Sequence, residues 1–186
     1  MLLAAGLLLG GAASGLAQVD EAQQRAKEID AFCRTAYCRP PRTVKVNLED
    51  GTAFERNVPR LPIVLPNGWI TIFAGEEIHI ELTVEQGKVT SARAVPKVDR
   101  RKQTITFRLR QQPGSAQTDL TVTSRLPRNL KYNLGVMLPS GGAAISSPSC
   151  PVQAGLTAHE TWVQPVFQAV IRDLRLLAED APLSCG

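Results

Sequence analysis

Several features are missing from this sequence of 186 residues. No apolar run reaches the roughly 18 residues that a membrane-spanning helix needs, which excludes a multi-span membrane protein. The motifs of serine hydrolases, zinc proteases, phosphate-binding loops and cysteine–histidine nucleophiles are absent as well. Two histidines leave little for acid–base catalysis. Disorder is also excluded, because Leu, Ile, Val and Phe are too frequent.

The amino-terminal residues carry no charge before Asp20. An apolar stretch from Leu2 to Leu9 gives way to small residues, which is the outline of a secretory signal peptide. Gly15 and Ala17 supply the small side chains of a cleavage site, so the sequence predicts a cut after Ala17. The basic residues that usually begin such a segment are missing, and an uncleaved anchor is the alternative interpretation.

Proline is absent before Pro40, although the chain has 13 prolines. Residues 18–32 are rich in Ala, Gln and Glu, with apolar residues three or four apart, which predicts a helix with a narrow apolar stripe. Pro40 and Pro41 interrupt it and start an extended segment. We therefore expect a signal peptide (1–17), a helical arm with a short cysteine loop (18–39) and a β domain (40–186).

Four cysteines form an even set, which an oxidising compartment would pair. Three connectivities are possible. The spacing favours Cys33 with Cys38, closing a short loop, and Cys150 with Cys185, tying the end of the chain to an upstream segment. Zinc ligation is disfavoured, because the chain has no C-x-x-C spacing. No metal or other cofactor is expected.

From Arg42 onward apolar and polar residues alternate, with turn residues about every ten positions, which is typical of antiparallel sheets. The pattern predicts seven to nine strands before Cys150, packed as an immunoglobulin-like sandwich. Two hairpin turns are predicted, at residues 85–88 and at residues 99–102. Residues 69–73 are expected to alternate between two faces. The tail at residues 166–177 fits a helix or a strand, and an edge or closing strand is favoured.

The strand spacing resembles that of exported bacterial immunoglobulin-like domains. The Cys-Trp-Cys core of immunoglobulins is not evident, so the resemblance covers the architecture alone. It implies a sandwich that presents loops to a partner.

Each histidine has a local setting that could carry chemistry. His79 alternates with Glu77 and Glu81 on one strand face, but ligands there would be about 7 Å apart, which is wide for one ion. His159 and Glu160 are expected in a loop and offer a possible hydrolase site. A solvated polar surface is favoured in both places.

Positive charge is distributed unevenly. The segment from Lys88 to Lys131 holds 11 of the 21 basic residues and two acidic ones, a net charge of +9, whereas the remainder carries −5. Such a segment attracts anions. The candidate contacts are Arg100, Arg101, Lys102, Arg108 and Arg110. Alternatively, these side chains pair with Glu77, Glu81 and Glu85 of a neighbouring strand, and this is favoured.

Trp69 and Trp162 could stack on a ligand, but packing in the core is favoured. The leading hypothesis is a non-enzymatic binding or structural module, periplasmic or secreted, with no transmembrane span in the mature chain. Its partner would be an envelope protein or an anionic glycan or lipid surface. Nucleic acid is the least favoured partner, because aromatic residues are not interleaved with the basic ones. The alternatives are a small exported hydrolase with a site near His159 and a carrier of an apolar ligand.

Overall fold

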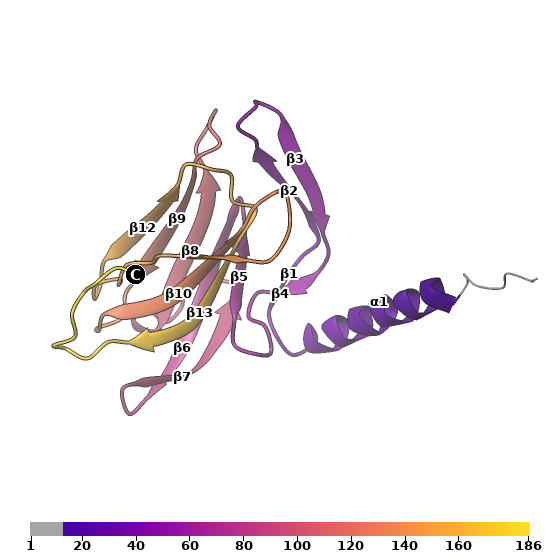
Figure 1. Cartoon of the computed structure of the whole chain (residues 1–186). Coiled ribbons are helices and arrows are strands. Elements are labelled where there is room, and N and C mark those ends of the chain that lie inside the picture. Colours follow the sequence, from indigo (N-terminus) through magenta and orange to yellow (C-terminus); the bar gives the residue numbers. More distant parts are fainter. Residues whose placement is uncertain (1–12) are drawn as a thin grey trace, which may run out of the picture.

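The computed structural model describes residues 13–186. Helix α1 runs from Ala13 to Phe32 and projects away from the rest of the chain (Figure 1). The predicted signal peptide lies mostly outside the described residues, and its predicted cut after Ala17 falls within α1. In the described part of the chain, no helix combines the length and the apolar character needed to cross a membrane.

Strands dominate the remainder, and every strand pair is antiparallel, so the prediction of a mainly β protein is confirmed. The first strands are β1 (Cys38–Arg39), β2 (Arg42–Asn47), β3 (Ala53–Val58), β4 (Leu61–Pro62) and β5 (Ile70–Phe73). They are followed by β6 (Glu76–Glu85), β7 (Lys88–Val95), the 3₁₀ turn η1 (Arg101–Gln103), β8 (Thr104–Gln111) and β9 (Thr118–Ser124). The last are β10 (Leu130–Met137), β11 (Ile145–Ser147), β12 (Thr157–Trp162) and β13 (Gln168–Leu176).

Two larger sheets and two small ones make up the described fold. The five-stranded sheet has the order β12-β9-β8-β6-β7, and the four-stranded sheet has the order β11-β10-β13-β5. They pack around a shared apolar cluster, an arrangement consistent with a β-sandwich (Figure 1). The pairs β1-β4 and β2-β3 form the small sheets, which lie on the side of α1.

Alternation builds the core, because successive side chains of a strand point to opposite faces. On β8, Ile105, Phe107 and Leu109 are fully buried, while Arg108 and Arg110 are exposed, as the sequence predicts. The Phe107 ring packs edge-on against Tyr132 of β10, with centroids 6.1 Å apart. This contact joins the two larger sheets.

The alternation predicted for residues 69–73 is wrong, because all four residues of β5 are buried. One face of β5 contributes to the main core, and the other is covered by the β2-β3 hairpin. Phe73 packs edge-on against Phe167 at 5.3 Å, in a second cluster that includes Val44 and Val46. A strand that is covered on both faces does not alternate between buried and exposed residues.

The turn at residues 85–88 is confirmed as a β6-β7 hairpin, with Gln86 and Gly87 at positive φ. The hairpin predicted at residues 99–102 is wrong. β7 and β8 both pair with β6, so the connection between them crosses the end of β6. Eleven described strands precede Cys150 rather than seven to nine, because strands of two or three residues are too short to show alternation.

The carboxy-terminal segment forms a strand, as favoured, but β13 lies between β10 and β5 rather than at an edge. Two disulfides join Cys33 to Cys38 and Cys150 to Cys185, which is the pairing that the sequence favours. Arg60 adds a hydrogen bond from its guanidinium to the carbonyl of Cys33, at 2.9 Å. The first disulfide therefore fixes the end of α1 next to the body.

Candidate functional site

The five cations predicted to bind anions fall into two groups. Arg100, Arg101 and Lys102 lie at or before η1, in the connection between β7 and β8. Arg108 and Arg110 lie farther along β8, on the outer face of the five-stranded sheet. Arg108 lies four positions beyond Thr104, where β8 begins, which is a distance of about 13 Å along a strand. The structure thus does not gather all five into one patch.

Two of these cations already have carboxylate partners. Glu77 lies opposite Arg108 in the β6-β8 register, and the Arg108 Nε atom donates to its carboxylate at 2.5 Å. Arg100 lies 3.6 Å from Glu81, which also accepts a 2.6 Å hydrogen bond from Arg93 of β7. Glu81 is buried, so this carboxylate needs its partners. Pairing across strands, the favoured alternative, accounts for these two arginines.

The exposed cations Arg101 and Lys102 lie in η1. Arg110 is also exposed and faces Asp119 in the β8-β9 register. Burial alone would raise the pKa of Asp119, but hydrogen bonds from Gln112, Thr161 and Gln117 and the charge of His159 lower it overall. Asp119 therefore stays ionised and offsets the charge of Arg110.

His79 and His159 both lie on the outer face of the five-stranded sheet, but on different strands. His79 Nδ1 is 3.0 Å from Thr106 Oγ1 and its Nε2 is 3.9 Å from Glu77 Oε1. His159 Nδ1 is 3.3 Å from Thr121 Oγ1. β8 and β9 separate the two histidine-bearing strands, so the histidines do not form one site.

The loop predicted around His159 and Glu160 is wrong, because both belong to the edge strand β12. Adjacent residues of a strand point to opposite faces. His159 is exposed, whereas Glu160 is half-buried and accepts a 2.8 Å hydrogen bond from the backbone N–H of Cys150. The two side chains therefore do not act on one substrate atom together.

The core packing predicted for the tryptophans is wrong for Trp69. Trp69 is 39% exposed, and the Arg172 guanidinium lies 5.3 Å from its ring centroid. Trp162 is half-buried against the core, and its Nε1 donates to Ser147 Oγ at 3.0 Å. Neither ring lies beside the cationic residues of η1.

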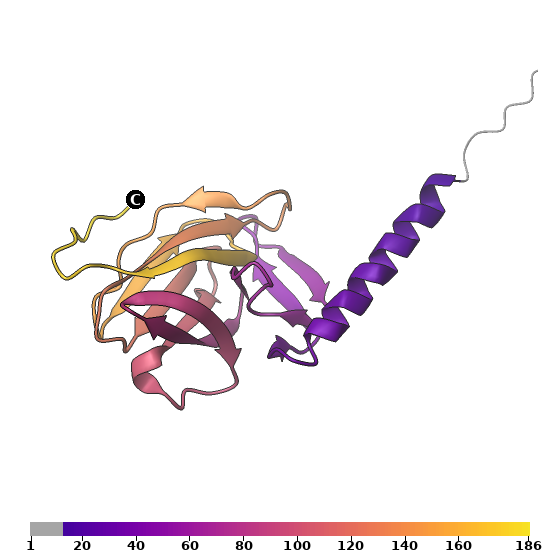
Figure 2. The same cartoon turned by 90° about the horizontal axis from the view of Figure 1, so that it is seen from below.

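A groove that the sequence did not reveal runs beside β7, with a volume of about 590 Å³. Residues 90–96 form one wall. The other wall comes from Phe32 at the end of α1, residues 35–37 of the Cys33–Cys38 loop, and residues 64–68 before β5. Figure 2, seen from below, shows the β6-β7 hairpin and the inner end of α1 on this side of the molecule. No local pattern could have predicted it, because its walls come from three separate segments.

A smaller cavity of about 210 Å³ adjoins the groove and shares Tyr37, Val95 and Pro96 with it. Arg39 and Arg42 line this cavity together with acidic residues of β6. The carboxylate of Glu76 lies 3.4 Å from each guanidinium.

Arg39 is almost fully buried, with 3% exposed. Its Nη2 donates to the carbonyl of Thr71 at 2.5 Å, and its guanidinium lies 4.6 Å from the centroid of the Phe73 ring. Burial lowers the pKa of Arg39, and the nearby charge of Glu76 opposes that shift. Among the described residues, Arg39 Nη1 has no hydrogen-bond partner. Buried arginine is rare, so composition did not point to this residue.

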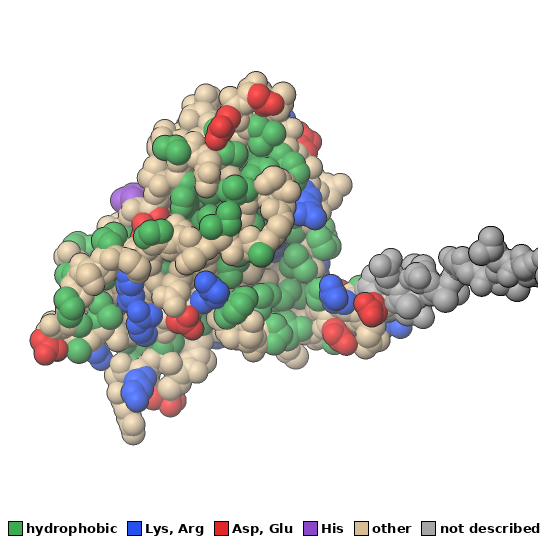
Figure 3. Space-filling model, viewed as in Figure 1, with side chains coloured by type: hydrophobic (Ala, Val, Ile, Leu, Met, Phe, Trp, Pro, Cys, Tyr) green, Lys and Arg blue, Asp and Glu red, His purple; other side chains and the backbone are tan. Residues whose placement is uncertain are grey.

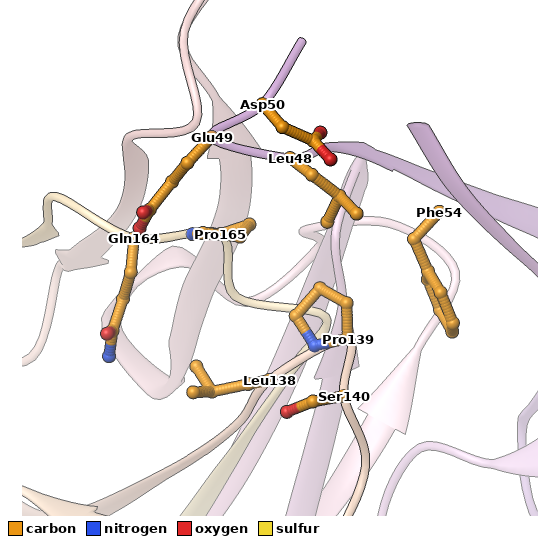
Figure 4. Close-up of a pocket in the computed structure, with 9 residues that line it drawn as sticks. All are labelled: Leu48, Glu49, Asp50, Phe54, Leu138, Pro139, Ser140, Gln164 and Pro165. Atoms are coloured by element: carbon orange, nitrogen blue, oxygen red, sulfur yellow. The ribbon is translucent and has the colours of Figure 1, made fainter. Parts of the chain in front are cut away.

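An apolar hollow of about 470 Å³ lies between the β2-β3 hairpin and the sandwich (Figure 4). Glu49 and Asp50 stand at its rim, and Thr52 donates two hydrogen bonds to Asp50, which lower the pKa of that carboxyl. The apolar lining consists of Leu48, Phe54, Leu138, Pro139 and Pro165. Figure 3 shows hydrophobic side chains gathered on this face of the molecule. The residues that line the hollow include no Lys and no Arg.

The described residues contain no group of three or more His, Cys, Asp or Glu side chains placed to hold a metal ion. No known protein family, curated protein or solved structure matches this chain. The proposals for function therefore depend on the geometry described above.

Proposed function

We propose that this chain is an exported, non-enzymatic binding or structural module of the cell envelope. Its immunoglobulin-like sandwich presents loops and a basic surface to a macromolecular partner, which is an envelope protein or an anionic glycan or lipid surface.

The observation that carries this proposal is the uneven charge. The segment from Lys88 to Lys131 carries a net +9. Part of that charge is used in ion pairs with β6, but Arg101 and Lys102 of η1 are exposed. A connection that holds exposed cations attracts anionic partners and speeds their association.

Export is supported by the cysteines and by the amino terminus. All four cysteines lie in disulfides. Such bonds persist in periplasmic and extracellular compartments and are rare in the cytosol. The uncharged segment before Asp20 fits the signal peptide that export requires.

The test compares the natural chain with the double variant Arg101→Glu/Lys102→Glu. Three immobilised probes are used: an anionic polysaccharide, phosphatidylglycerol vesicles and an envelope protein extract. We expect the natural chain to be retained on at least one probe at about 50 mM salt, a concentration at which surface charges are only partly screened. The double variant should lose this retention, because it carries negative charge at both positions.

Arg25→Glu/Lys27→Glu on the exposed surface of α1 is the matched control, because it changes the net charge equally. We expect this variant to be retained like the natural chain. The proposal is contradicted if the natural chain is retained on no probe, or if both double variants lose retention to the same degree.

A further inference from the structure

β7 is an edge strand of the five-stranded sheet. It pairs with β6 on one side, and within the described chain no strand pairs with its other side. Edge strands present a row of free backbone N–H and C=O groups, which proteins commonly protect with proline, lysine, a bulge or a covering segment. The free edge of β7 is therefore a candidate surface for pairing with another chain.

The part of β7 from Ser91 to Val95 has one charged side chain, Arg93, which pairs with Glu81 of β6. It contains no proline and no lysine, and its register with β6 is regular from His79 to Thr83. The irregular pairing lies nearer the hairpin turn, next to Val84. Ser91 is exposed, and Ala92 and Ala94, which are half-buried against the core, also have small side chains that leave room beside the backbone.

The groove gives this edge the shape of a binding site. It follows residues 90–96 and has a second wall opposite them, so an extended segment lying in it would contact both walls. Tyr37, in the second wall, is 45% exposed and offers an aromatic surface. Extended peptides bind other proteins in this way, with main-chain hydrogen bonds to an edge strand and side-chain contacts to the groove.

Charge indicates the chemistry of the occupant. Between Glu81 and Lys102 the chain has six basic residues and three acidic ones. In the smaller cavity that adjoins the groove, Arg39 and Arg42 share the carboxylate of Glu76, while Glu77 pairs with Arg108. The buried Arg39 Nη1 has no hydrogen-bond partner among the described residues. Since guanidinium groups bind carboxylates well, this adjoining cavity suits an acidic side chain or a chain terminus of a segment that lies in the groove.

We propose that the groove beside β7 binds an extended, acidic peptide segment of a protein partner. The segment adds to the free edge of β7 as a further strand and places a carboxylate near Arg39 and Arg42. This inference rests on the proposed function, because it specifies the partner of the basic module as a protein and gives its mode of binding.

The experiment begins with a displayed library of random peptides of about ten residues, long enough to follow the edge strand. It is selected on the full chain with both disulfides formed. We expect an enriched, acidic consensus, and we expect the synthetic consensus peptide to lose binding about tenfold or more when alternate backbone nitrogens are methylated. No enrichment, a basic consensus, or unchanged binding after methylation would overturn the proposal.

The site is located with the pair Ser91→Pro and Ala92→Pro. Neighbouring residues of a strand direct their N–H groups to opposite sides, so one substitution removes a bond to β6 and the other removes a donor to the groove. We expect one variant to lose thermal stability. The other should keep the natural Tm and bind the peptide about tenfold more weakly or worse. Natural affinity in the stable variant would overturn the proposal.

The matched control applies the same substitution to the other edge of the sheet, as Ala158→Pro and His159→Pro in β12. The stable member of this pair should bind the peptide like the natural chain. A loss of binding there, equal to that in the stable β7 variant, would place the peptide elsewhere and overturn the proposal.

Arg42→Gln tests the proposed position of the carboxylate in the adjoining cavity, since Arg42 is partly exposed there. The variant should weaken the acidic peptide several-fold and leave unchanged a peptide in which the critical carboxylate is replaced by an amide. Equal effects on both peptides would overturn the placement of the carboxylate.

The two proposals fail separately. If Arg101→Glu/Lys102→Glu abolishes retention on the envelope probes while the β7 variants leave peptide binding intact, the basic module stands and strand addition is wrong. A second copy of the chain bound through β7 would appear as a concentration-dependent dimer that excludes the peptide, and that result would also overturn strand addition by a partner.

Discussion

β7 and β12 are the two edges of the same five-stranded sheet, yet their surroundings differ. β12 is tied to the opposite side of the sandwich by Trp162, which donates to Ser147, and by Glu160, which accepts from Cys150. β7 borders a groove whose far wall comes from the amino-terminal third of the chain. Whether an edge strand can bind another chain therefore depends more on its neighbours in space than on its own sequence.

The largest loss of stability is expected when a side chain is removed from the core that both edges share. Phe107 lies on β8, in the interior of the sheet, and is fully buried against Tyr132. Phe107→Ala should lower the free energy of unfolding by about 3–5 kcal/mol. Chemical denaturation should show one transition in which β7 and β12 are lost together. A loss below about 1 kcal/mol would contradict the assignment of this ring to the core.

The two disulfides stabilise different ends of the molecule. Cys150–Cys185 has a sequence separation of 35 and Cys33–Cys38 a separation of 5. Loop entropy predicts that replacing both cysteines by alanine costs about 4 kcal/mol for the first bond and about 2 kcal/mol for the second. Denaturant midpoints of the two double variants measure the difference.

Only the Cys33→Ala/Cys38→Ala variant should also weaken the peptide at β7, because residues 35–37 form part of the groove wall. Equal loss of peptide binding in both double variants would show that the groove depends on global stability rather than on the position of this loop.

Arg39 tests how the wall of the groove is fixed to the body. Arg39→Met removes the hydrogen bond to Thr71 and the contact with Glu76, which should cost about 2 kcal/mol. Arg56→Met is the control, because its exposed guanidinium only lies over Phe167. Amide hydrogen exchange should quicken around β1 and β4 and stay unchanged in β12. Equal quickening in both regions would contradict a local role for Arg39.

The smallest effect is expected beside β12, from Asp119. Its folded pKa lies below the ordinary value, so its contribution to stability is present above about pH 4 and is lost as the pH falls through the folded pKa. Asp119→Asn should lower stability near neutral pH by no more than about 0.5 kcal/mol, because water screens this half-buried group at the surface of the sheet. Tm measured against pH should converge for the two proteins in acid. A constant difference at every pH would contradict the ionised role.

Much of the sandwich could be predicted from the sequence, because several of its strands, such as β8 and β9, bury one face. The alternation of Ile105, Phe107 and Leu109 gave β8 its face, and Gly87 marked the β6-β7 turn. The burial of both faces of β5 could not be predicted in this way, because the second face is covered by the β2-β3 hairpin. β1 and β4, of two residues each, are too short to carry a period.

The candidate site was predicted only in part. The basic segment was evident from composition, and pairing with β6 was foreseen as the alternative. The groove could not be predicted, because Phe32, Tyr37 and Gly68 come beside β7 only through the tertiary fold. No local sequence pattern marks Arg39 as buried, since its partners Thr71 and Glu76 lie more than 30 residues away along the chain.

The most direct measurement is residue-by-residue amide hydrogen exchange of the full chain with and without the selected acidic peptide. If the segment adds to the edge of β7, alternate amides between Ser91 and Val95 become protected, and the amides of β12 exchange at their natural rate. Protection confined to β12, or none along β7, would contradict the account.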